Sequence, residues 1–248
     1  GRPFYEMPGI MGRICGICTI SHSMASAKAC DEIMSVQIPY TARKLRRIVN
    51  LASTIQSHAL SFFYLSSPDF LLGMESDPQK RSIFGLVESH PEIARDGVRL
   101  RRFGQQIIER IAGKRLHPKW IVPGGVASPL QDDVRKEILA EIPEIYALLH
   151  RNLDWFKRSM EDYNQEIRTF GNFPTMFMGT INKQGNLDLY DGDLRIVDAT
   201  NDVGCDDGGE NADDRDNHQE LNEGESAPGI RSRADRPGEM IPYHTAMK

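Results

Sequence analysis

The pattern of hydrophobic and polar residues along this chain of 248 residues predicts a mainly helical protein. The clearest signal runs from Thr41 to Ser67, where apolar side chains recur every three or four residues, as they do on one face of an α-helix. The apolar positions are Leu45, Ile48, Val49, Ala52, Ile55, Ala59, Phe62 and Phe63. Pro68 follows and marks the expected end of this helix.

Two other helices are expected in the first half of the chain. One is capped by Ser21 or Ser23, continues to Ile33, and ends before Pro39. The other lies within residues 90–118, where the glycine of the AGK triplet (residues 112–114) is placed to close it.

A further helix is expected from Ser128, with Pro129 at its first position and acidic residues in its first turn. Pro143 should kink or break it. Ahead of this helix, residues 120–129 read as an extended segment with a turn at Gly124 and Gly125. The sequence therefore indicates helices interrupted by a short extended connection.

The character of the chain changes after Phe170. Residues 173–199 contain short β-like runs separated by the turn sequences QGN and DGD, which predicts a small β-hairpin region. Between Asp198 and Glu225 eleven acidic residues accompany one basic residue, Arg215. We therefore expect a folded domain over residues 1–197 and an acidic tail over residues 198–248 that is disordered or aberrant, because the tail has too few apolar residues to form a core.

Composition excludes several classes of protein. No window approaches the roughly 18–20 apolar residues of a membrane span, and no signal peptide or basic, aromatic-rich nucleic-acid stripe is visible. The densest basic run, Arg43–Asn50, is interpreted as a solvated helix face. Four cysteines do not make a disulfide framework in a chain of this length, so the cytoplasm is the expected compartment. Because the chain opens on Gly1 within sequence that already reads as folded, we expect a fragment.

Candidate chemistry gathers in one stretch, MGRICGICTISH. Cys15 and Cys18 are spaced so that two thiolates can converge on one metal from a tight turn, and Gly16 lets the backbone fold closely around it. Arg13 favours the thiolate form, and His22 can donate a hydrogen bond to a sulfur or a metal ligand. A bare C-x-x-C is also compatible with zinc binding, a redox dithiol or two ordinary cysteines.

The complete pattern R-x-C-G-x-C-x-x-x-H is far more specific. It resembles the amino-terminal metal-binding motif of the nickel–iron hydrogenase large subunit. The resemblance extends over about residues 1–195, through the segments GRPFYEMPGIMGRICGIC, HALSFFYLSSPDFLLGM and HPKWIVPGGV, which look like the cytoplasmic, pyridine-nucleotide-linked branch of that family.

This resemblance implies a helical large-subunit core and an oxidoreductase that reversibly splits H2 at a nickel–iron centre. Cys15 would be a terminal nickel ligand, Cys18 a bridge to an iron carrying carbon monoxide and cyanide, His22 a neighbour of the ligands, and Arg13 a residue at the face towards the small subunit. Implied partners are that small subunit with iron–sulfur clusters, diaphorase subunits leading to NAD(H), and maturation proteins.

Part of the family pattern has no match here. The family takes two more cysteines from a second motif, D-P-C-x-x-C-x-x-H, and Cys205 does not fit it, so this stretch alone is expected not to turn over hydrogen. Glu6 is the nearest candidate for the family's magnesium-site acid. Two alternatives stay open: a stand-alone zinc or dithiol protein whose site is finished by Cys205 or His22, and a non-catalytic complex I-like relative, which generally lacks the cysteines.

Three other residues have ordinary interpretations. Cys30 is expected to be a small buried hydrophobe, and His58 a hydrogen-bonded core histidine. His117 belongs to a segment that the resemblance places on the active-site side, so a supporting role near the site is a minority interpretation for it.

Overall fold

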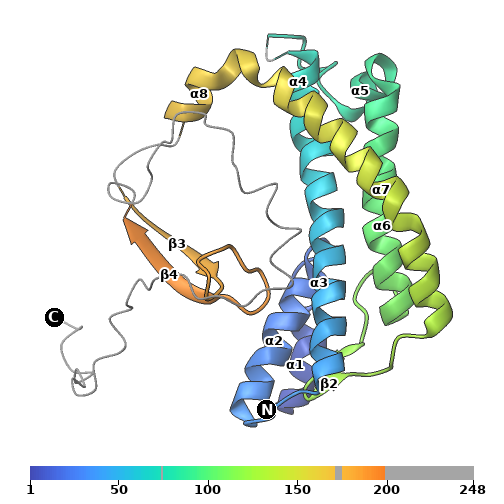
Figure 1. Ribbon diagram of the computed structural model, residues 1–248, viewed down its shortest axis with the longest axis vertical. Helices are drawn as coiled ribbons and strands as arrows, with labels where there is room; N and C mark the ends of the chain where they lie inside the picture. The colour runs from blue at the N-terminus through green and yellow to red at the C-terminus, as the bar shows by residue number, and fades with distance from the viewer. Residues whose placement is uncertain (74, 171–174, 199–248) are drawn as a thin grey trace, which may run out of the picture. The chain divides into compact units, whose positions relative to one another are not determined.

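Long helices carry most of the chain in the computed structural model, which describes residues 1–73, 75–170 and 175–198 (Figure 1). The mainly helical class with small strand pairs is confirmed. The acidic stretch from residue 199 onwards, including Cys205, lies outside the described residues. In chain order the elements are η1 (Phe4–Glu6), α1 (Met7–Met11), α2 (Thr19–Ile33), α3 (Tyr40–Leu60), η2 (Ser61–Ser66), α4 (Ser67–Leu72), α5 (Ile83–Ser89), α6 (Pro91–Ala112), β1 (Ile121–Val122), β2 (Gly125–Val126), α7 (Asp132–Ser159), η3 (Glu161–Tyr163), α8 (Asn164–Thr169), β3 (Met176–Ile181) and β4 (Asp193–Asp198).

The main core lies between α3 and α6, whose axes run side by side in Figure 1. Two glycines on α6 allow this approach, because a Cβ on Gly104 would lie 2.5 Å from the carbonyl oxygen of Ala52 and one on Gly97 would lie 2.5 Å from Phe63. The two glycines are seven positions apart, so both lie on the same face of α6. Gly113 closes α6 with a left-handed φ of 81°, as the sequence predicts.

The expected end of the long helix at Pro68 is wrong. The chain instead passes through one π-helical stretch, η2, and continues as α4, with Pro68 in the first turn of α4. Proline has no N–H to donate, and the wider π turn accommodates this loss. The Ser67 hydroxyl donates to the Phe62 carbonyl at 2.8 Å, so a side chain satisfies one of the carbonyls in this turn.

The predicted features of α7 are partly corrected. The helix begins at Asp132 rather than Ser128, and its first turn is acidic as expected. Pro143 neither breaks nor ends it. Pro143 is exposed, and so is Leu139, whose carbonyl loses its helical partner, so water can satisfy that carbonyl.

Charged side chains join α6 to α7. Arg99 contacts Glu141 and Glu144 at 3.0 Å each, and Arg110 contacts Glu141 at 2.7 Å. Burial tends to raise the pKa of Glu141, but its hydrogen bonds to the two arginines outweigh this and lower that pKa. Glu141 therefore stays ionised between two cations that fix how the helices face each other.

Some of the apolar positions predicted on α3 are not in the core. Ile48 and Ile55 are 39% and 37% exposed, whereas Leu45, Val49 and Ala52 are buried. The exposed isoleucines line a groove with apolar side chains of α7. The helical periodicity is right, but the apolar stripe is wider than the face that α6 covers.

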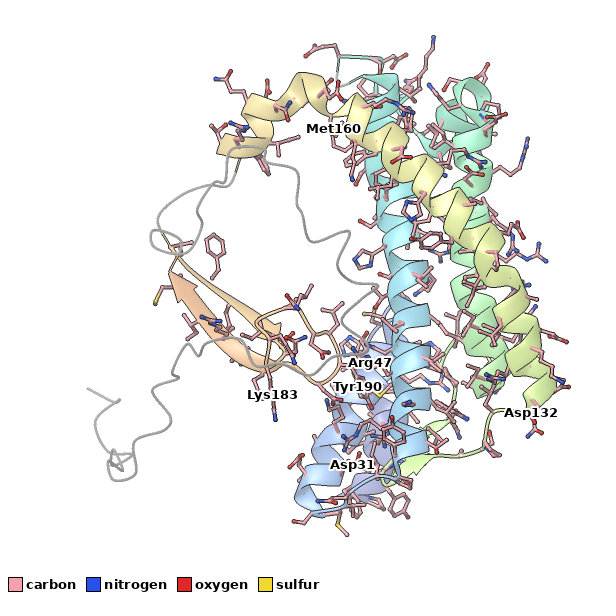
Figure 2. The ribbon with its side chains drawn as sticks, viewed as in Figure 1. Asp31, Arg47, Asp132, Met160, Lys183 and Tyr190 are labelled. Atoms are coloured by element: carbon pink, nitrogen blue, oxygen red, sulfur yellow. The ribbon has the colours of Figure 1, made fainter. Side chains whose placement is uncertain are left out.

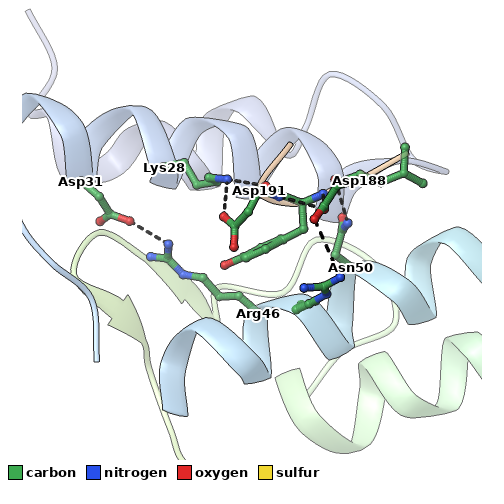
Figure 3. A network of polar contacts seen from close by, with 9 residues as sticks. Lys28, Asp31, Arg46, Asn50, Asp188 and Asp191 are labelled. Carbon is green, nitrogen blue, oxygen red and sulfur yellow. Dashed lines mark hydrogen bonds and ion pairs between the residues drawn. The ribbon is translucent and has the colours of Figure 1, made fainter. Parts of the chain in front are cut away.

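The basic run Arg43–Asn50 is not simply a solvated face. Arg46 is fully buried, while Arg43, Lys44 and Arg47 are exposed. The Nη1 of Arg46 contacts Asp31 at 2.7 Å (Figure 3). Its Nε donates to the Gly125 carbonyl at 2.9 Å, and its Nη2 donates to the Val122 carbonyl at 2.6 Å. Arg46 thus joins α3 to α2 and to the β1–β2 pair.

The turns predicted at Gly124–Gly125 and at QGN are present. β1 and β2 pair antiparallel around Pro123 and Gly124, where Gly124 has a φ of 85° and donates its N–H to Asp31 at 2.6 Å. In the β3–β4 region the QGN turn has Gly185 at a φ of 89°, and the Asn182 side-chain oxygen accepts two backbone N–H groups.

The loop between Leu187 and Asp191 lies against α2 and α3. Lys28 bonds the Tyr190 carbonyl and pairs with Asp191 at 3.0 Å, while Asn50 donates to the Leu189 carbonyl at 3.3 Å. Tyr190 is buried beside α3, near Arg47 in Figure 2, and this burial raises the pKa of its hydroxyl. No helix in the described part of the chain is long and apolar enough to cross a bilayer.

Replacing Arg46 by Met should lower the free energy of unfolding by about 3–5 kcal/mol, because it leaves the buried carboxylate of Asp31 without its cation. Urea denaturation followed by circular dichroism measures this. The exposed Arg47→Met is the matched control and should change stability by less than about 0.5 kcal/mol. Adding Asp31→Leu to Arg46→Met should recover part of the loss; equal losses in the Arg46 and Arg47 variants would contradict the assignment.

Gly104→Ala should destabilise the chain by about 1–3 kcal/mol, since the new methyl group meets the backbone of α3 and forces the helices apart. Gly9→Ala in α1 is the control, because nothing lies within 4 Å of the added carbon there. The comparison is made by the midpoint of thermal unfolding. A Gly104 variant as stable as the Gly9 variant would show that α3 and α6 can separate without cost.

Candidate metal centre

The cysteine motif occupies the connection from α1 to α2. Turn hydrogen bonds carry the chain out of α1, from Arg13 N–H to the Ile10 carbonyl at 2.9 Å and from Ile14 N–H to the Met11 carbonyl at 3.1 Å. Gly12 is buried against α2, where an added Cβ would lie 2.4 Å from the Ser23 hydroxyl. A glycine at this position therefore lets α1 and its loop lie close to α2.

The start of α2 differs from the prediction. Cys18 is the N-cap residue and Thr19 the first helical residue, while Ser21 and Ser23 lie inside the helix and provide no cap. The first helical bond runs from the His22 N–H to the Cys18 carbonyl at 3.2 Å. One turn of helix thus separates Cys18 from His22 and places both side chains on the same face.

The structure brings together three residues of the motif whose side chains could hold a metal ion. The sulfurs of Cys15 and Cys18 and a ring nitrogen of His22 all lie within 4.8 Å of one another, and all three residues are half-buried. Among the described residues, no other group of three histidine, cysteine, aspartate or glutamate side chains has its donor atoms this close together. Neither cysteine is in a disulfide.

The two thiols are not equivalent. The hydrogen bond from the Cys18 thiol, together with the Cys18 N–H at 3.2 Å from the Cys15 sulfur, lowers the pKa of Cys15. Donating that hydrogen bond raises the pKa of Cys18, and burial and the nearby Cys15 charge raise it further. Cys15 is therefore the first of the pair to become a thiolate, the form that binds metal.

Polar side chains from α2, from α3 and from the connection before β1 form hydrogen bonds with the backbone of the loop. The Thr19 hydroxyl donates to the Gly12 carbonyl at 2.8 Å, and His117 Nδ1 lies 2.8 Å from the same carbonyl. Gln56, buried on α3, donates to the Ile17 carbonyl at 2.8 Å. The supporting role of His117 was a minority interpretation from the sequence, and its direct contact with the motif loop favours that role.

Sequence reasoning missed Gln56. The signal available was a polar side chain in the apolar stripe of the long helix, four residues after Ala52 and three before Ala59. Helical periodicity assigns such a residue to the buried face, and a buried amide needs a partner. The sequence does not say that this partner is the Ile17 carbonyl.

The remaining predicted residues have mixed outcomes. Cys30 is buried, with its sulfur 3.4 Å from the Phe4 carbonyl, as expected for a small core residue. His58 is hydrogen-bonded to the Thr54 carbonyl at 2.9 Å, but it is exposed, so the core placement is wrong. Arg13 is exposed beside the cluster. Glu6 pairs with Arg2 at 2.9 Å and is not part of the three-residue group.

The donor set fits a soft or borderline transition metal. Two thiolates and one imidazole are ligands that nickel, iron and zinc accept, whereas magnesium and calcium prefer oxygen. A complete site needs more than two sulfurs, and the half-buried positions of Cys15 and Cys18 leave them accessible to further ligands. The residues present therefore fit part of a thiolate metal centre.

Comparisons with known proteins agree with this chemistry. Residues 1–83, which contain the whole cysteine cluster and Gln56, match the family model described as nickel-dependent hydrogenase. Over this stretch the chain is similar to the nickel-dependent hydrogenase family. Its relatives include the F420-non-reducing hydrogenase vhu of Methanocaldococcus jannaschii, one chain of which is 39% identical over 79% of this chain and 47% of the relative.

A second relative is the NAD-reducing hydrogenase HoxS subunit beta of Cupriavidus necator, 34% identical over 80% of this chain and 43% of the relative. The chain thus spans about half the length of the curated hydrogenases it matches. A solved NAD+-reducing [NiFe]-hydrogenase in the H2-reduced state superposes with a TM-score of 0.77 at 42% identity, over 81% of this chain and 45% of that one. The Ni-Fe-Se hydrogenase of D. vulgaris Hildenborough, at 21% identity and a TM-score of 0.63, shares the fold.

Proposed function

We propose that this chain forms part of a hydrogenase catalytic subunit that interconverts H2 with protons and electrons. One observation carries the proposal: the sulfurs of Cys15 and Cys18 lie within 4.8 Å of each other and of His22, inside the segment that matches the nickel-dependent hydrogenase family. Cys15 and Cys18 would be two of the thiolate ligands that hold a nickel–iron centre. When bound, such a centre supplies the heterolytic splitting of H2.

The chain's own residues have distinct tasks in this proposal. Cys15, whose pKa is lowered by the hydrogen bond from Cys18, offers the first thiolate. A ring nitrogen of His22 lies within 4.8 Å of both cysteine sulfurs, so His22 would hold a proton beside them. Arg13, exposed at the edge of the loop, places positive charge where a partner protein would approach.

The electron route is a finer part of the proposal. Relatives of this chain include both NAD-reducing and F420-non-reducing hydrogenases, and the match to the NAD+-reducing structure at 42% identity supports NAD(H) as the final acceptor. Electrons would leave through a small subunit with iron–sulfur clusters and through diaphorase subunits in the cytoplasm. Maturation proteins would add the carbon monoxide and cyanide ligands of the iron, and a magnesium ion would bind elsewhere in the protein.

Metal binding by the chain itself is the first test. Anaerobic titration with Co2+ or Ni2+ should produce a sulfur-to-metal charge-transfer absorption, and Cys15→Ser or Cys18→Ser should weaken binding at least about tenfold, since even residues that only support ligands cost that much. Cys30→Ser is the matched control, because that thiol is buried outside the cluster. Binding that disappears in Cys205→Ser would instead favour the stand-alone zinc or dithiol protein.

The activity requires the complete enzyme with its partner subunits. There, Cys15→Ser and Cys18→Ser should each abolish H2-dependent reduction of a viologen dye, because a ligand of the reacting centre is removed, and Cys30→Ser should retain it. Assaying NAD+ in place of the dye tests the acceptor separately. Full dye reduction by either ligand variant would refute the assignment of Cys15 and Cys18 as metal ligands.

A further inference from the structure

We infer that Thr19 and His117 are positioning residues that hold the cysteine loop in its metal-binding shape before any metal arrives, with Gln56 as a second anchor. The inference rests on the proposed function, because it assigns these residues a task toward the centre that Cys15 and Cys18 would bind. Neither Thr19 nor His117 supplies a ligand in this scheme. Each acts through the backbone of the loop.

The first supporting contact is a hydrogen bond within the loop itself. Thr19, directly after Cys18, donates its hydroxyl proton to the carbonyl of Gly12, at 2.8 Å. This bond joins the two ends of the stretch that contains Arg13, Cys15 and Cys18. Thr19 is only 2% exposed, so water does not compete for the bond.

The second supporting contact comes from the imidazole of His117, which reaches the same Gly12 carbonyl from a distant part of the chain. Its Nδ1 lies 2.8 Å from the Gly12 carbonyl and 3.0 Å from the Thr19 hydroxyl oxygen. Because a carbonyl oxygen can only accept, Nδ1 carries the proton and shares it between the two oxygens. The bond that closes the loop and the bond that attaches it to the segment before β1 therefore share one acceptor, the Gly12 carbonyl.

The backbone of His117 has an unusual conformation, with a positive φ. Its φ of 51° is in the left-handed region, which is uncommon for residues other than glycine, although histidine, asparagine and aspartate adopt it more often than the rest. Such strain persists only when the surroundings impose it, and it is concentrated at functional sites. In this structure the backbone conformation of His117 places its ring against the Gly12 carbonyl of the loop.

Apolar packing contributes little to holding the loop. Ile14, just before Cys15, is 65% exposed and Ile17, between the cysteines, is 46% exposed, so hydrophobic contacts do not fix this part of the loop. The bond from Gln56 to the Ile17 carbonyl at 2.8 Å supplies an anchor at the far side of the loop. Hydrogen bonds from Thr19, His117 and Gln56 therefore add to the direct bond from the Cys18 N–H to the Cys15 sulfur in fixing the loop, and removing them should cost metal affinity.

The experiment compares His117→Gly, His117→Asn and Thr19→Val in the full chain by anaerobic Co2+ titration. Glycine relieves the backbone strain but removes the ring, whereas asparagine tolerates the left-handed region and retains an N–H donor. We expect affinity to fall about 10- to 100-fold in His117→Gly and Thr19→Val, with a shifted charge-transfer band, and to be partly restored in His117→Asn. The double variant His117→Gly/Thr19→Val should lose less than the sum of both, because the residues act on one carbonyl.

Circular dichroism and the midpoint of thermal unfolding of the metal-free chain separate positioning from general stability. Folded His117→Gly and Thr19→Val variants that bind Co2+ with the affinity and band of the unaltered chain would overturn the inference while leaving the proposed function intact. If Cys15→Ser and Cys18→Ser also bind Co2+ normally, the proposed function itself fails. If His117→Gly does not fold, Thr19→Val, which preserves shape and removes the hydroxyl, decides alone.

Discussion

The buried contact between Arg46 and Asp31 is the constraint on which the arrangement around the cysteine loop depends. Arg46 has no exposed surface, and its guanidinium contacts Asp31 on α2 (Figure 3). It also donates to two carbonyls of the β1–β2 pair. These elements, together with α3, also supply or adjoin every anchor of the loop: Thr19 opens α2, Gln56 lies on α3, and His117 precedes β1. A displacement of any one of them would move an anchor, so the ion pair in the interior supports the geometry of the half-buried cysteine cluster.

Helical periodicity was enough to predict the fold class and the central parts of the helices, because burial of one face imposes the same spacing wherever the partner helix lies. The helix boundaries failed where tertiary structure outweighs local preference. Pro68 is tolerated because a π-helical turn precedes it, and Pro143 because the carbonyl it leaves free belongs to a helix exposed to water. The end of α6 at Gly113 was predicted correctly, because a left-handed residue that closes a helix is a local requirement that the sequence alone reveals.

The candidate site shows the same division. The spacing of Cys15, Cys18 and His22 determines their proximity within one loop and one helical turn, so the cluster could be read from the sequence. Gln56 and His117 reach the loop only through folding, with His117 98 positions beyond Thr19 in the sequence. Arg46 was misread because a cluster of charges usually signals a solvated face, and no single sequence shows that one member is paired with Asp31 inside the protein.

The loop is fixed through its main chain, and this has a chemical consequence. Thr19, His117 and Gln56 all bond to carbonyl oxygens, so they stabilise the fold of the loop without occupying the lone pairs of either sulfur. The hydrogen bonds that do reach the Cys15 sulfur come from the backbone N–H and the thiol of Cys18, and they favour the thiolate. A site built in this way can be rigid and still leave its donor atoms open to a metal, a combination that anchoring through the cysteine side chains themselves would not allow.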